Sequence, residues 1–309
     1  MMLTMHEYIA TVPFDLYELH LFAFVAKNGS FTKAAELAGL TQSAITRQIQ
    51  GMENSLGVKR LERTTRSVRL TEAGKFLMGE STRLLGDVER SLQTLRVEYA
   101  GAKKQVRVGV SRAISLAYMP GFFHANLKRL PEVACRVSHQ SDESLLSALE
   151  SNELDVVIVC PPVRLPRTVR ITRTFDDSFT LIAPAEVAKT FAASSPNRRA
   201  RQRWMSLQKW LLIEKASNTG RRLQSWIATQ AWAVEPTMEL DNFDLIVNLV
   251  SLGMGVSFVP ARALALYGQK RTIERISLPE RFTRELAVVI RKHRKMPQHI
   301  EQFVENVLF

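Results

Sequence analysis

The apolar positions of residues 41–56 recur at the spacing of one face of an α-helix. They lie four, three and four residues apart and are Ile45, Ile49, Met52 and Leu56. Thr41 stands where its hydroxyl would cap the first turn, and Gly57 stands where a left-handed residue would end the last one. We therefore predict one amphipathic helix with a buried apolar face.

Two shorter helices are predicted before this one. Residues 19–26 and the alanine-rich residues 31–38 follow the helical period, and three residues separate the second of these helices from the amphipathic helix. Two helices joined by a tight turn that contains glycine form a helix-turn-helix. Residues 58–71 alternate charged and apolar side chains, which predicts a small β-wing with Thr64 and Thr65 at its tip.

Residues 73–100 form a long helical pattern. Its stripe keeps three- and four-residue spacing through Met78, Ser81, Leu85, Val88, Leu92, Leu95 and Tyr99. Roughly three heptads of this kind favour a coiled-coil dimer seam, with Leu77 and Leu84 on a flank that rests on the winged helix-turn-helix. The alternative is a helix that packs only within its own domain.

The pattern after residue 104 alternates apolar strands with helices. The first series has strands at 106–110, 134–138 and 156–159, with helices at 116–127 and 144–149. The second series has strands at 180–183, 211–213, 255–259 and 286–290, with helices at 221–232, 243–252 and 299–308. Alternating strands and helices predict a parallel α/β sheet in two lobes that enclose a cleft, with crossings at 164–173 and 273–278.

These patterns divide the chain into four predicted parts. They are a winged helix-turn-helix at 1–72, a dimerisation linker helix at 73–100, a first α/β lobe at 101–165 with 272–309, and a second lobe at 166–271. The predicted fold class is α/β with an N-terminal winged helix-turn-helix and a long coiled-coil linker helix.

Basic residues outnumber acidic ones, most clearly around the predicted wing. The 309 residues include 42 lysines and arginines against 30 acidic residues, for a net charge of +12. Between residues 47 and 75 the basic residues are Arg47, Lys59, Arg60, Arg63, Arg66, Arg69 and Lys75, and the acidic ones are Glu53, Glu62 and Glu72. A local cationic excess beside a helix-turn-helix favours contact with the phosphates of double-stranded DNA. A solvated basic face is the alternative.

The polar side of the amphipathic helix carries short amides and hydroxyls with one arginine. These residues are Gln42, Ser43, Thr46, Arg47 and Gln50. Glutamine pairs with adenine and arginine with guanine in the major groove, and hydroxyls reach base edges or phosphates. The helix-turn-helix around this face distinguishes it from an ordinary solvated one, so we predict that it reads DNA sequence.

Several classes of chemistry are disfavoured by the residue pattern. Cys135 and Cys160 stand in no CxxC or Cys/His spacing, which argues against a disulfide framework and a metal site. Cys160 and His139 lack the acid and the oxyanion donors of a thiol enzyme, and Gly253 and Gly255 lack the third glycine of a dinucleotide site. We expect no catalytic residue, no metal and no cofactor.

The sequence also bears on location. The first residues lack a charged stretch followed by an apolar core, so no signal peptide is expected. The longest uncharged run, 245–261, is interrupted by Asn248, two glycines and Pro260, and it falls short of the ~18 residues of a membrane span. We expect a cytoplasmic protein with no membrane partner.

A run of short motifs between residues 24 and 74 carries a specific resemblance. The motifs are Phe24-Val25-Ala26, Gly29-Ser30-Phe31-Thr32-Lys33-Ala34-Ala35, Leu40-Thr41-Gln42-Ser43-Ala44, Arg47-Gln48-Ile49, Met52-Glu53, Leu56-Gly57, Arg63-Thr64-Thr65-Arg66 and Leu70-Thr71-Glu72-Ala73-Gly74. Weaker motifs are Leu154-Asp155, Gly253-Met254-Gly255-Val256 and Val259-Pro260. On these residues the chain resembles the LysR-type transcriptional regulators.

Two departures from that family stand out. Arg60-Leu61 replaces the usual Leu-Phe, which would loosen the packing of the wing or add a phosphate contact. Residues 192–203 replace a His-Pro-Leu type turn that is common early in the second lobe.

The resemblance implies an effector-responsive, DNA-binding regulator with a periplasmic-binding-protein-like domain of two lobes. It implies assembly as homo-dimers or homo-tetramers, and RNA polymerase as a further partner. The amphipathic helix would face bases, while the preceding helix and the wing would hold phosphates. The implied DNA-binding residues are Thr32, Lys33, Thr41, Gln42, Ser43, Thr46, Arg47, Gln50, Arg63, Thr65, Arg66 and Arg69.

The resemblance also places a small-molecule effector between the two lobes. The implied effector-binding residues are Ser111, Arg112, Ala113, Ser141, Asp142, Cys160, Pro161, Thr219, Asn242 and Phe243. Strand ends and helix N-termini converge there, and their free N–H groups favour a carboxylate. Asp142 stands where the family often has a small hydroxyl residue. It would favour a cationic or hydroxylated ligand, pair with Arg112, or cap a helix that begins near Ser144.

Residues 101–309 alone would also suit a stand-alone small-molecule-binding protein without DNA function. The helix-turn-helix and the lack of a signal peptide favour the regulator instead. Deleting residues 1–100 would leave a ligand-binding protein under either interpretation, but only the regulator would bind DNA when intact.

Overall fold

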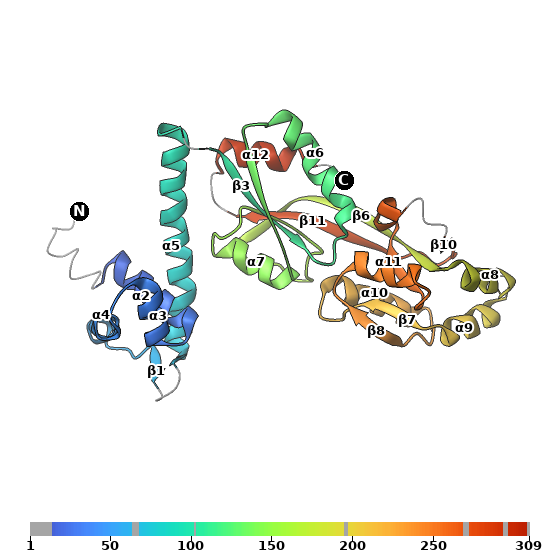
Figure 1. Ribbon diagram of the computed structural model, residues 1–309, viewed down its shortest axis with the longest axis horizontal. Helices are drawn as coiled ribbons and strands as arrows, with labels where there is room; N and C mark the ends of the chain where they lie inside the picture. Colours follow the sequence, from blue (N-terminus) through green and yellow to red (C-terminus); the bar gives the residue numbers. More distant parts are fainter. Residues whose placement is uncertain are drawn as a thin grey trace. The chain divides into compact units, whose positions relative to one another are not determined.

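The computed structural model describes residues 14–63, 68–101, 103–194, 197–267, 272–292 and 296–307. The chain packs into two compact units, Met1–Ala100 and Gly101–Phe309 (Figure 1). The first unit is helical with a small hairpin, and the second is a two-lobed α/β structure. The fold class that the hydrophobic pattern predicts is therefore confirmed.

The described part of the N-terminal unit runs from three short helices to a long one. Its elements are α2 (Leu16–Asn28), α3 (Phe31–Ala38), α4 (Gln42–Leu56), β1 (Leu61–Arg63), β2 (Val68–Leu70) and α5 (Glu72–Tyr99). Each of these helices begins at a side-chain cap that accepts a free N–H of the first turn. The capping residues are Asp15, Ser30, Thr41 and Thr71. The predicted helix-turn-helix is formed by α3 and α4.

The core of this unit forms where the short helices meet. Ile45, Ile49 and Met52 of α4 are at most 1% exposed and belong to one cluster with residues of α2 and α3. Leu56, the fourth predicted position, is 36% exposed and lies outside that cluster. The predicted apolar face is correct for three positions and wrong for Leu56, because the last turn of α4 extends past the core.

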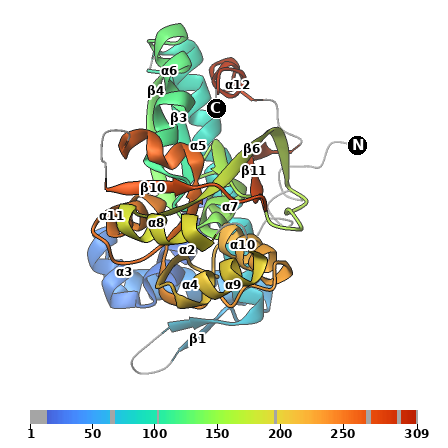
Figure 2. The same ribbon diagram turned by 90° about the vertical axis from the view of Figure 1, so that its right-hand side faces the viewer.

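Strands β1 and β2 form the predicted antiparallel wing. Figure 2 shows β1 at the edge of the unit, beyond α3 and α4. Glu53 of α4 anchors the wing, since its Oε1 accepts hydrogen bonds from the backbone N–H groups of Arg60 (2.9 Å) and Leu61 (3.2 Å). The predicted tip at Thr64 and Thr65 lies outside the described residues.

Arg60, the cation in place of an expected leucine, points into the protein. It is only 4% exposed, and its Nη1 donates a hydrogen bond to the carbonyl oxygen of Met52 (3.0 Å) in the last turns of α4. Burial lowers the pKa of the Arg60 guanidinium, and the charge of Glu53 opposes this shift. The arginine therefore fills the place of an apolar anchor, and the expected phosphate contact at this position is wrong.

The apolar stripe of α5 serves two surfaces. Leu77, Met78 and Leu85 pack against the core of the helix-turn-helix, and Ser81 is fully buried. The rest of the stripe is exposed within this chain, with fractions of 37% for Val88, 51% for Leu92, 56% for Leu95 and 85% for Tyr99. Of the two predicted flank residues, Leu77 rests on the helix-turn-helix, but the prediction is wrong for Leu84, which is 43% exposed. A single seam that starts at Met78 is therefore wrong for its first half, which the chain itself covers.

The C-terminal unit alternates strands and helices. Its first elements are β3 (Gln105–Ser111), η1 (Leu116–Tyr118), α6 (Met119–Arg129), β4 (Ala134–Gln140), α7 (Asp142–Glu150) and β5 (Val156–Val159). The next are β6 (Val169–Pro184), α8 (Ala185–Ser194), α9 (Arg198–Leu207), β7 (Trp210–Ile213), α10 (Asn218–Thr229), β8 (Pro236–Leu240) and α11 (Phe243–Ser251). The last are β9 (Ser257–Pro260), η2 (Ala261–Tyr267), β10 (Ile273–Ile276), β11 (Thr283–Arg291) and α12 (Gln298–Glu305).

The hydrophobic pattern does not predict α8, α9 or β8. Helix α9 is rich in arginine and buries only Trp204 and Met205, so its apolar period is short. Strand β8 is exposed at four of its five positions, so it lacks the alternation of a half-buried strand. Helix α9 and strand β8 both lie at the surface of the second lobe. Their conformation depends on packing against neighbouring elements more than on their own hydrophobic pattern.

One mixed sheet runs through both lobes. Its order is β10-β6-β11-β5-β3-β4, and β9 also pairs with β6. Strand β3 is parallel to β4 and β5, and β7 is parallel to β8. Strand β11 is antiparallel to both β5 and β6. The predicted parallel arrangement therefore holds within each lobe, while the strands that connect the lobes are antiparallel.

Strand β6 passes from one lobe to the other without a break (Figure 1). Its residues 169–178 pair with β11 of the first lobe, and residues 179–184 pair with β9 and β10 of the second. Strand β11 makes the return, because residues 273–278 pack in the core of the second lobe. Both crossings thus lie later in the sequence than predicted.

Candidate DNA interface and effector pocket

The predicted base-reading residues lie on the side of α4 opposite its buried face. Its exposed positions are Thr41, Gln42, Ser43, Arg47 and Gln50, with Thr46 partly buried. The Thr41 hydroxyl is engaged in capping, since it accepts a hydrogen bond from the N–H of Ala44 (3.2 Å). Among the described residues Arg47 has no ion-pair partner, so its guanidinium is available to a base or a phosphate.

The predicted phosphate contacts lie on α3 and on the wing. Thr32 and Lys33 are exposed in the first turn of α3, where free N–H groups also favour an anion. Arg69 is exposed on β2. The predicted wing contacts whose side chains lie outside the described part of the chain are Arg63, Thr65 and Arg66.

The cationic excess around the wing is smaller on the surface than in the sequence. Arg60 is buried, and Lys75 is paired with Glu72 at 2.6 Å. Glu53 is turned inward onto the wing backbone. Apart from Lys75, which is exposed but paired, the exposed cations of this region among the described side chains are Arg47, Lys59 and Arg69.

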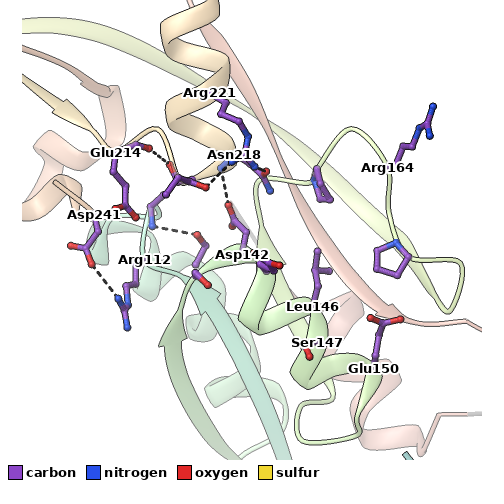
Figure 3. Close-up of a pocket in the computed structure, with 18 residues that line it drawn as sticks. Arg112, Asp142, Leu146, Ser147, Glu150, Arg164, Glu214, Asn218, Arg221 and Asp241 are labelled. Atoms are coloured by element: carbon purple, nitrogen blue, oxygen red, sulfur yellow. Dashed lines mark hydrogen bonds and ion pairs between the residues drawn. The ribbon is translucent and has the colours of Figure 1, made fainter. Parts of the chain in front are cut away.

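A pocket of about 550 Å³ lies between the two lobes of the C-terminal unit (Figure 3). Its walls include the carboxyl ends of β3 and β4 and the first turns of α7 and α10. Five of the predicted effector-binding residues line it, namely Ser111, Arg112, Ala113, Ser141 and Asp142. They follow parallel strands, which is the edge of an α/β sheet where ligands bind.

The other five predicted residues do not line this pocket. They are Cys160, Pro161, Thr219, Asn242 and Phe243. The carbonyl oxygens of Cys160 and Pro161 accept hydrogen bonds from Asn218 and Arg222 of the second lobe, both at 2.8 Å. Burial raises the pKa of the Cys160 thiol, so this side chain stays neutral. These residues join the lobes behind the pocket wall.

Helix α10 begins directly at the end of β7, which brings its first turn to the pocket. Ser217 caps the helix by accepting a hydrogen bond from the N–H of Gly220 (3.0 Å). A Cβ atom at position 220 would lie 1.9 Å from the carbonyl oxygen of Glu214. Only glycine therefore permits this close approach, which sets Asn218 opposite α7.

Asp142 is the first residue of α7 and points across the pocket toward α10 (Figure 3). Its Oδ2 accepts a hydrogen bond from the backbone N–H of Asn218 (3.3 Å). The cap of α7 is Ser141, which accepts from the N–H of Ser144, and Arg112 pairs with Asp241 at 3.2 Å. The interpretations of Asp142 as the helix cap and as the partner of Arg112 are therefore both wrong.

The Asp142 carboxyl group is 6% exposed, and its Oδ1 has no hydrogen-bond partner among the described residues. Burial raises the pKa of this carboxyl above its usual value, although Ser111, the N–H of Asn218 and Arg284 favour the charged form. The folded protein thus holds this proton more tightly than the unfolded chain. Stability from this group is lost as the pH rises from about 3.8 toward the raised value.

Replacing Asp142 by Asn should therefore stabilise the protein at pH 7, because the uncharged amide avoids the desolvation cost. The gain should be smaller at pH 4 than at pH 7, because the raised pKa of this carboxyl favours its uncharged form as the pH falls. Urea unfolding of both proteins at the two pH values measures this difference. A less stable Asn variant at pH 7 would contradict the expected cost of the buried charge.

The side chains that line the pocket include more carboxylates than guanidiniums. Its carboxylates are Asp142, Glu143, Glu150, Glu214 and Asp241, and its guanidiniums are Arg112, Arg164 and Arg221. Arg221 donates to the carbonyl oxygens of Ala216 (2.7 Å) and Lys215 (3.4 Å). Arg112 is held by Asp241, and Arg164 points away from Asp142 (Figure 3). The predicted carboxylate effector does not fit this balance of charge.

A buried charged network lies where β6 and β11 pass between the lobes. Arg284 and Asp177 are cross-strand partners, and the Arg284 Nε donates to Asp177 Oδ2 at 2.8 Å. Their side chains are 0% and 3% exposed. The Tyr118 hydroxyl donates to the other carboxylate oxygen, and burial, followed by the charge of Asp177, raises the pKa of Tyr118.

The same guanidinium reaches both lobes. Arg284 Nη1 donates to the carbonyl oxygen of Ala113 (2.8 Å) and to the hydroxyl of Thr219 (2.7 Å). Its central carbon lies 5.4 Å from the ring centroid of Phe243. Asn242 caps α11 through the N–H of Asp244, next to this ring. Thr219 and Phe243 are thus structural supports of the network.

Sequence reasoning missed the second-lobe side of the pocket and the buried network. Glu214 and Asp241 are the first polar residues after β7 and β8, so the rule that placed Ser111 and Ser141 would have found them had β8 been predicted. Arg284 and Asp177 stand 107 residues apart. Only the register between β6 and β11 brings them together.

The described residues include no helix with an apolar stretch of the length that a membrane span needs. They also hold no group of three or more His, Cys, Asp or Glu side chains arranged around a metal ion.

Comparison with known proteins identifies both parts of the chain. The family model described as "LysR substrate binding domain" matches residues 100–308. The model described as "Bacterial regulatory helix-turn-helix protein, lysR family" matches residues 16–75. The second match argues against a stand-alone small-molecule-binding protein.

Similar proteins cover nearly the whole chain. A "Probable RuBisCO transcriptional regulator" of Thalassiosira pseudonana is 28% identical over 286 residues, which cover 90% of this chain and 92% of the relative. The "Uncharacterized HTH-type transcriptional regulator YfeR" of Shigella flexneri is 27% identical over 286 residues, covering 92% and 90%.

Solved structures show the same fold. A full-length OxyR of Pseudomonas aeruginosa has a TM-score of 0.68 at 21% identity and covers 95% of this chain and 94% of its own. Full-length CbnR complexed with its target DNA has a TM-score of 0.67 at 21% identity, covering 95% and 99%. With a helix-turn-helix at one end and a substrate-binding domain over two thirds of its length, this chain belongs to the LysR family of transcriptional regulators.

Proposed function

We propose that this regulator reads its DNA site with the polar face of α4 and holds phosphates with the first turn of α3 and the wing. The observation that carries the proposal is the division of α4 into two faces. Ile45 and Ile49 are buried on one face, while Gln42, Arg47 and Gln50 are exposed on the other. Amides and a guanidinium on a second helix-turn-helix helix match major-groove readout.

A homo-dimer formed through the second half of α5 supports this function. The exposed stripe from Val88 to Tyr99 is long enough for nearly two heptads of a coiled coil. A symmetric pair of α4 helices would read two half-sites about one helical turn, or a multiple, apart. A homo-tetramer would double this arrangement.

The pocket between the lobes is the proposed effector site. It is lined from both lobes, by Ser111 and Asp142 on one side and Asn218 on the other. A ligand that touches both lobes would shift an existing equilibrium between their arrangements. That shift would change DNA binding or the contact with RNA polymerase.

Replacing Arg47 by Ala should weaken binding to the selected site by ~1–3 kcal/mol. The site is first obtained by selection from random duplexes, and affinity is then measured by fluorescence anisotropy at several salt concentrations. Random DNA should lose less affinity than the selected site. An equal loss on both would identify Arg47 as a phosphate contact and contradict base readout.

Arg69→Ala is the matched control, because it removes the same charge from the wing. This variant should weaken all sequences alike and reduce the salt slope by about 1. If Arg69→Ala relaxed sequence preference while Arg47→Ala did not, the proposed division between α4 and the wing would be reversed.

A further inference from the structure

We propose that Asp142 occupies the anion position of the effector pocket with its own carboxylate, so that the pocket takes a ligand that presents an amine or a guanidine. This inference rests on the proposed function of the pocket as the effector site. The proposed ligand class differs from the carboxylate effector that strand ends and helix N-termini would predict. Four observations support the inference: the position of the carboxylate, its unpaired oxygen, the surrounding charge, and the engagement of the arginines.

The carboxylate of Asp142 sits where two helix N-termini meet. Asp142 is the first residue of α7, and Asn218 is the first residue of α10. The N-terminal ends of helices attract anions through free N–H groups and the helix dipole. Asp142 Oδ2 takes one of these groups, the N–H of Asn218, at 3.3 Å. A carboxylate supplied by a ligand would have to compete with a side chain already in place.

The other oxygen of this carboxylate is unsatisfied. Asp142 is more than nine-tenths buried and lines the pocket, and its Oδ1 has no hydrogen-bond partner among the described residues. A buried acceptor without a donor is costly. A ligand N–H group that reached Oδ1 as the lobes shift would remove that cost, and a cationic one would also balance the charge.

The groups around Asp142 reinforce a demand for a cation. Glu143 and Glu214 line the same pocket and form no ion pair among the described residues. The nearby guanidiniums are engaged, since Arg112 pairs with Asp241 and Arg221 binds the carbonyl oxygen of Ala216 at 2.7 Å. An incoming carboxylate would meet the like charge of Asp142 in a pocket whose lining carboxylates outnumber its guanidiniums.

Arg284 lies behind the pocket wall and does not supply the missing cation. Its guanidinium is held by Asp177 at 2.8 Å and by Thr219 at 2.7 Å. Its charge favours the ionised form of Asp142, against the larger effect of burial, which raises the pKa of this carboxyl. If Asp142 were protonated instead, its hydroxyl could donate a hydrogen bond to the carboxylate of an acid ligand. A comparison of amine and acid ligands distinguishes these two states of Asp142.

The test compares amines and acids that share a carbon skeleton. The melting temperature of the full-length protein is measured with benzylamine against benzoate, and with butylamine against butyrate. The wild type should be stabilised by the amine of each pair, by about 3 to 6 °C at ten times its Kd, and less by the acid. Asp142→Ser replaces the carboxylate by a small hydroxyl and leaves the N–H groups of the two helix N-termini available to an anion. This variant should therefore be stabilised more by the acid of each pair than by the amine.

Glu132→Gln is the control, because it removes the same charge from an exposed position of the same unit that does not line the pocket, and it should keep the wild-type order. Asp142→Asn preserves the side-chain shape, and it should lose the preference for amines even if Asp142→Ser folds poorly. A wild type that prefers acids would overturn the inference. The inference would also be overturned if substitution at Asp142 left the preference between amine and acid unchanged. The same holds if none of the four compounds changed the melting temperature.

Binding to duplex DNA by the same proteins separates this inference from the proposed function. A wild type that binds its selected DNA site but prefers acids in the pocket rejects the amine ligand alone. A wild type that binds no DNA rejects the proposed regulator function, whatever the pocket prefers.

Discussion

Replacing Arg284 by Met is expected to lower the free energy of unfolding of the C-terminal unit by about 3–5 kcal/mol. The methionine would leave the carboxylate of Asp177 buried without its cation, since the Asp177 side chain is only 3% exposed. It would also remove the hydrogen bond to the hydroxyl of Thr219 (2.7 Å). The loss arises from the uncompensated charge more than from the removed volume.

Tryptophan fluorescence during urea unfolding measures this effect on the C-terminal unit alone. The chain has four tryptophans, and they are Trp204, Trp210, Trp226 and Trp232. The midpoint and slope of the transition give the free energy of unfolding in the full-length protein.

Two control variants separate the buried charge from other effects. Arg112→Met breaks an ion pair whose side chains are 54% and 45% exposed, so it should cost no more than about 1 kcal/mol. Adding Asp177→Asn to Arg284→Met removes the orphaned charge and should recover much of the loss. Equal losses for Arg284→Met and Arg112→Met would show that burial of the pair is not the cause.

Replacing Leu92 by Glu is expected to convert the proposed dimer into monomers. Leu92 lies in the middle of the exposed stripe of α5, where each protomer of a coiled coil would bury it against its partner. Two carboxylates in that seam would be desolvated and would repel each other. The dimer Kd should rise at least ~100-fold, which corresponds to about 2.7 kcal/mol.

Sedimentation velocity over a range of protein concentrations measures the change in assembly. Gln93→Glu adds the same charge at the next residue, on a different side of α5, and should leave the dimer intact. Monomers of Leu92→Glu that lose affinity for a two-half-site duplex but keep weak binding to one half-site would support the arrangement. Dimers that persist in Leu92→Glu would place the interface elsewhere.

The N-terminal unit was predictable because its signals are local. The cap at Thr41, the stop at Gly57 and the spacing of Ile45, Ile49 and Met52 all lie within α4. The prediction failed where distant residues decide the outcome. Arg60 counted as a surface cation in the sequence, but it is buried and donates to the carbonyl oxygen of Met52, eight residues earlier in the chain.

The candidate pocket was predictable only on its first-lobe side. Ser111 ends the apolar strand β3 and Ser141 directly follows β4, so their place at the sheet edge follows from the order of strands and helices. The opposite wall depends on the packing of lobe on lobe, which no local period encodes. The sequence identified Asp142 as unusual, but its meaning depends on Asn218, which stands 76 residues away.

The uninterrupted strand β6 determines how the lobes can move. Both lobes hydrogen-bond to this one strand, so a paired β-strand and not a flexible loop connects them. Ribbons of β-strands change shape most readily by altering their twist. We therefore expect a ligand in the pocket to rotate one lobe about the axis of β6. The strand would resist this change of twist and would return the lobe to its starting position when the ligand leaves. We expect the response to binding in this fold to be a rotation of one lobe relative to the other.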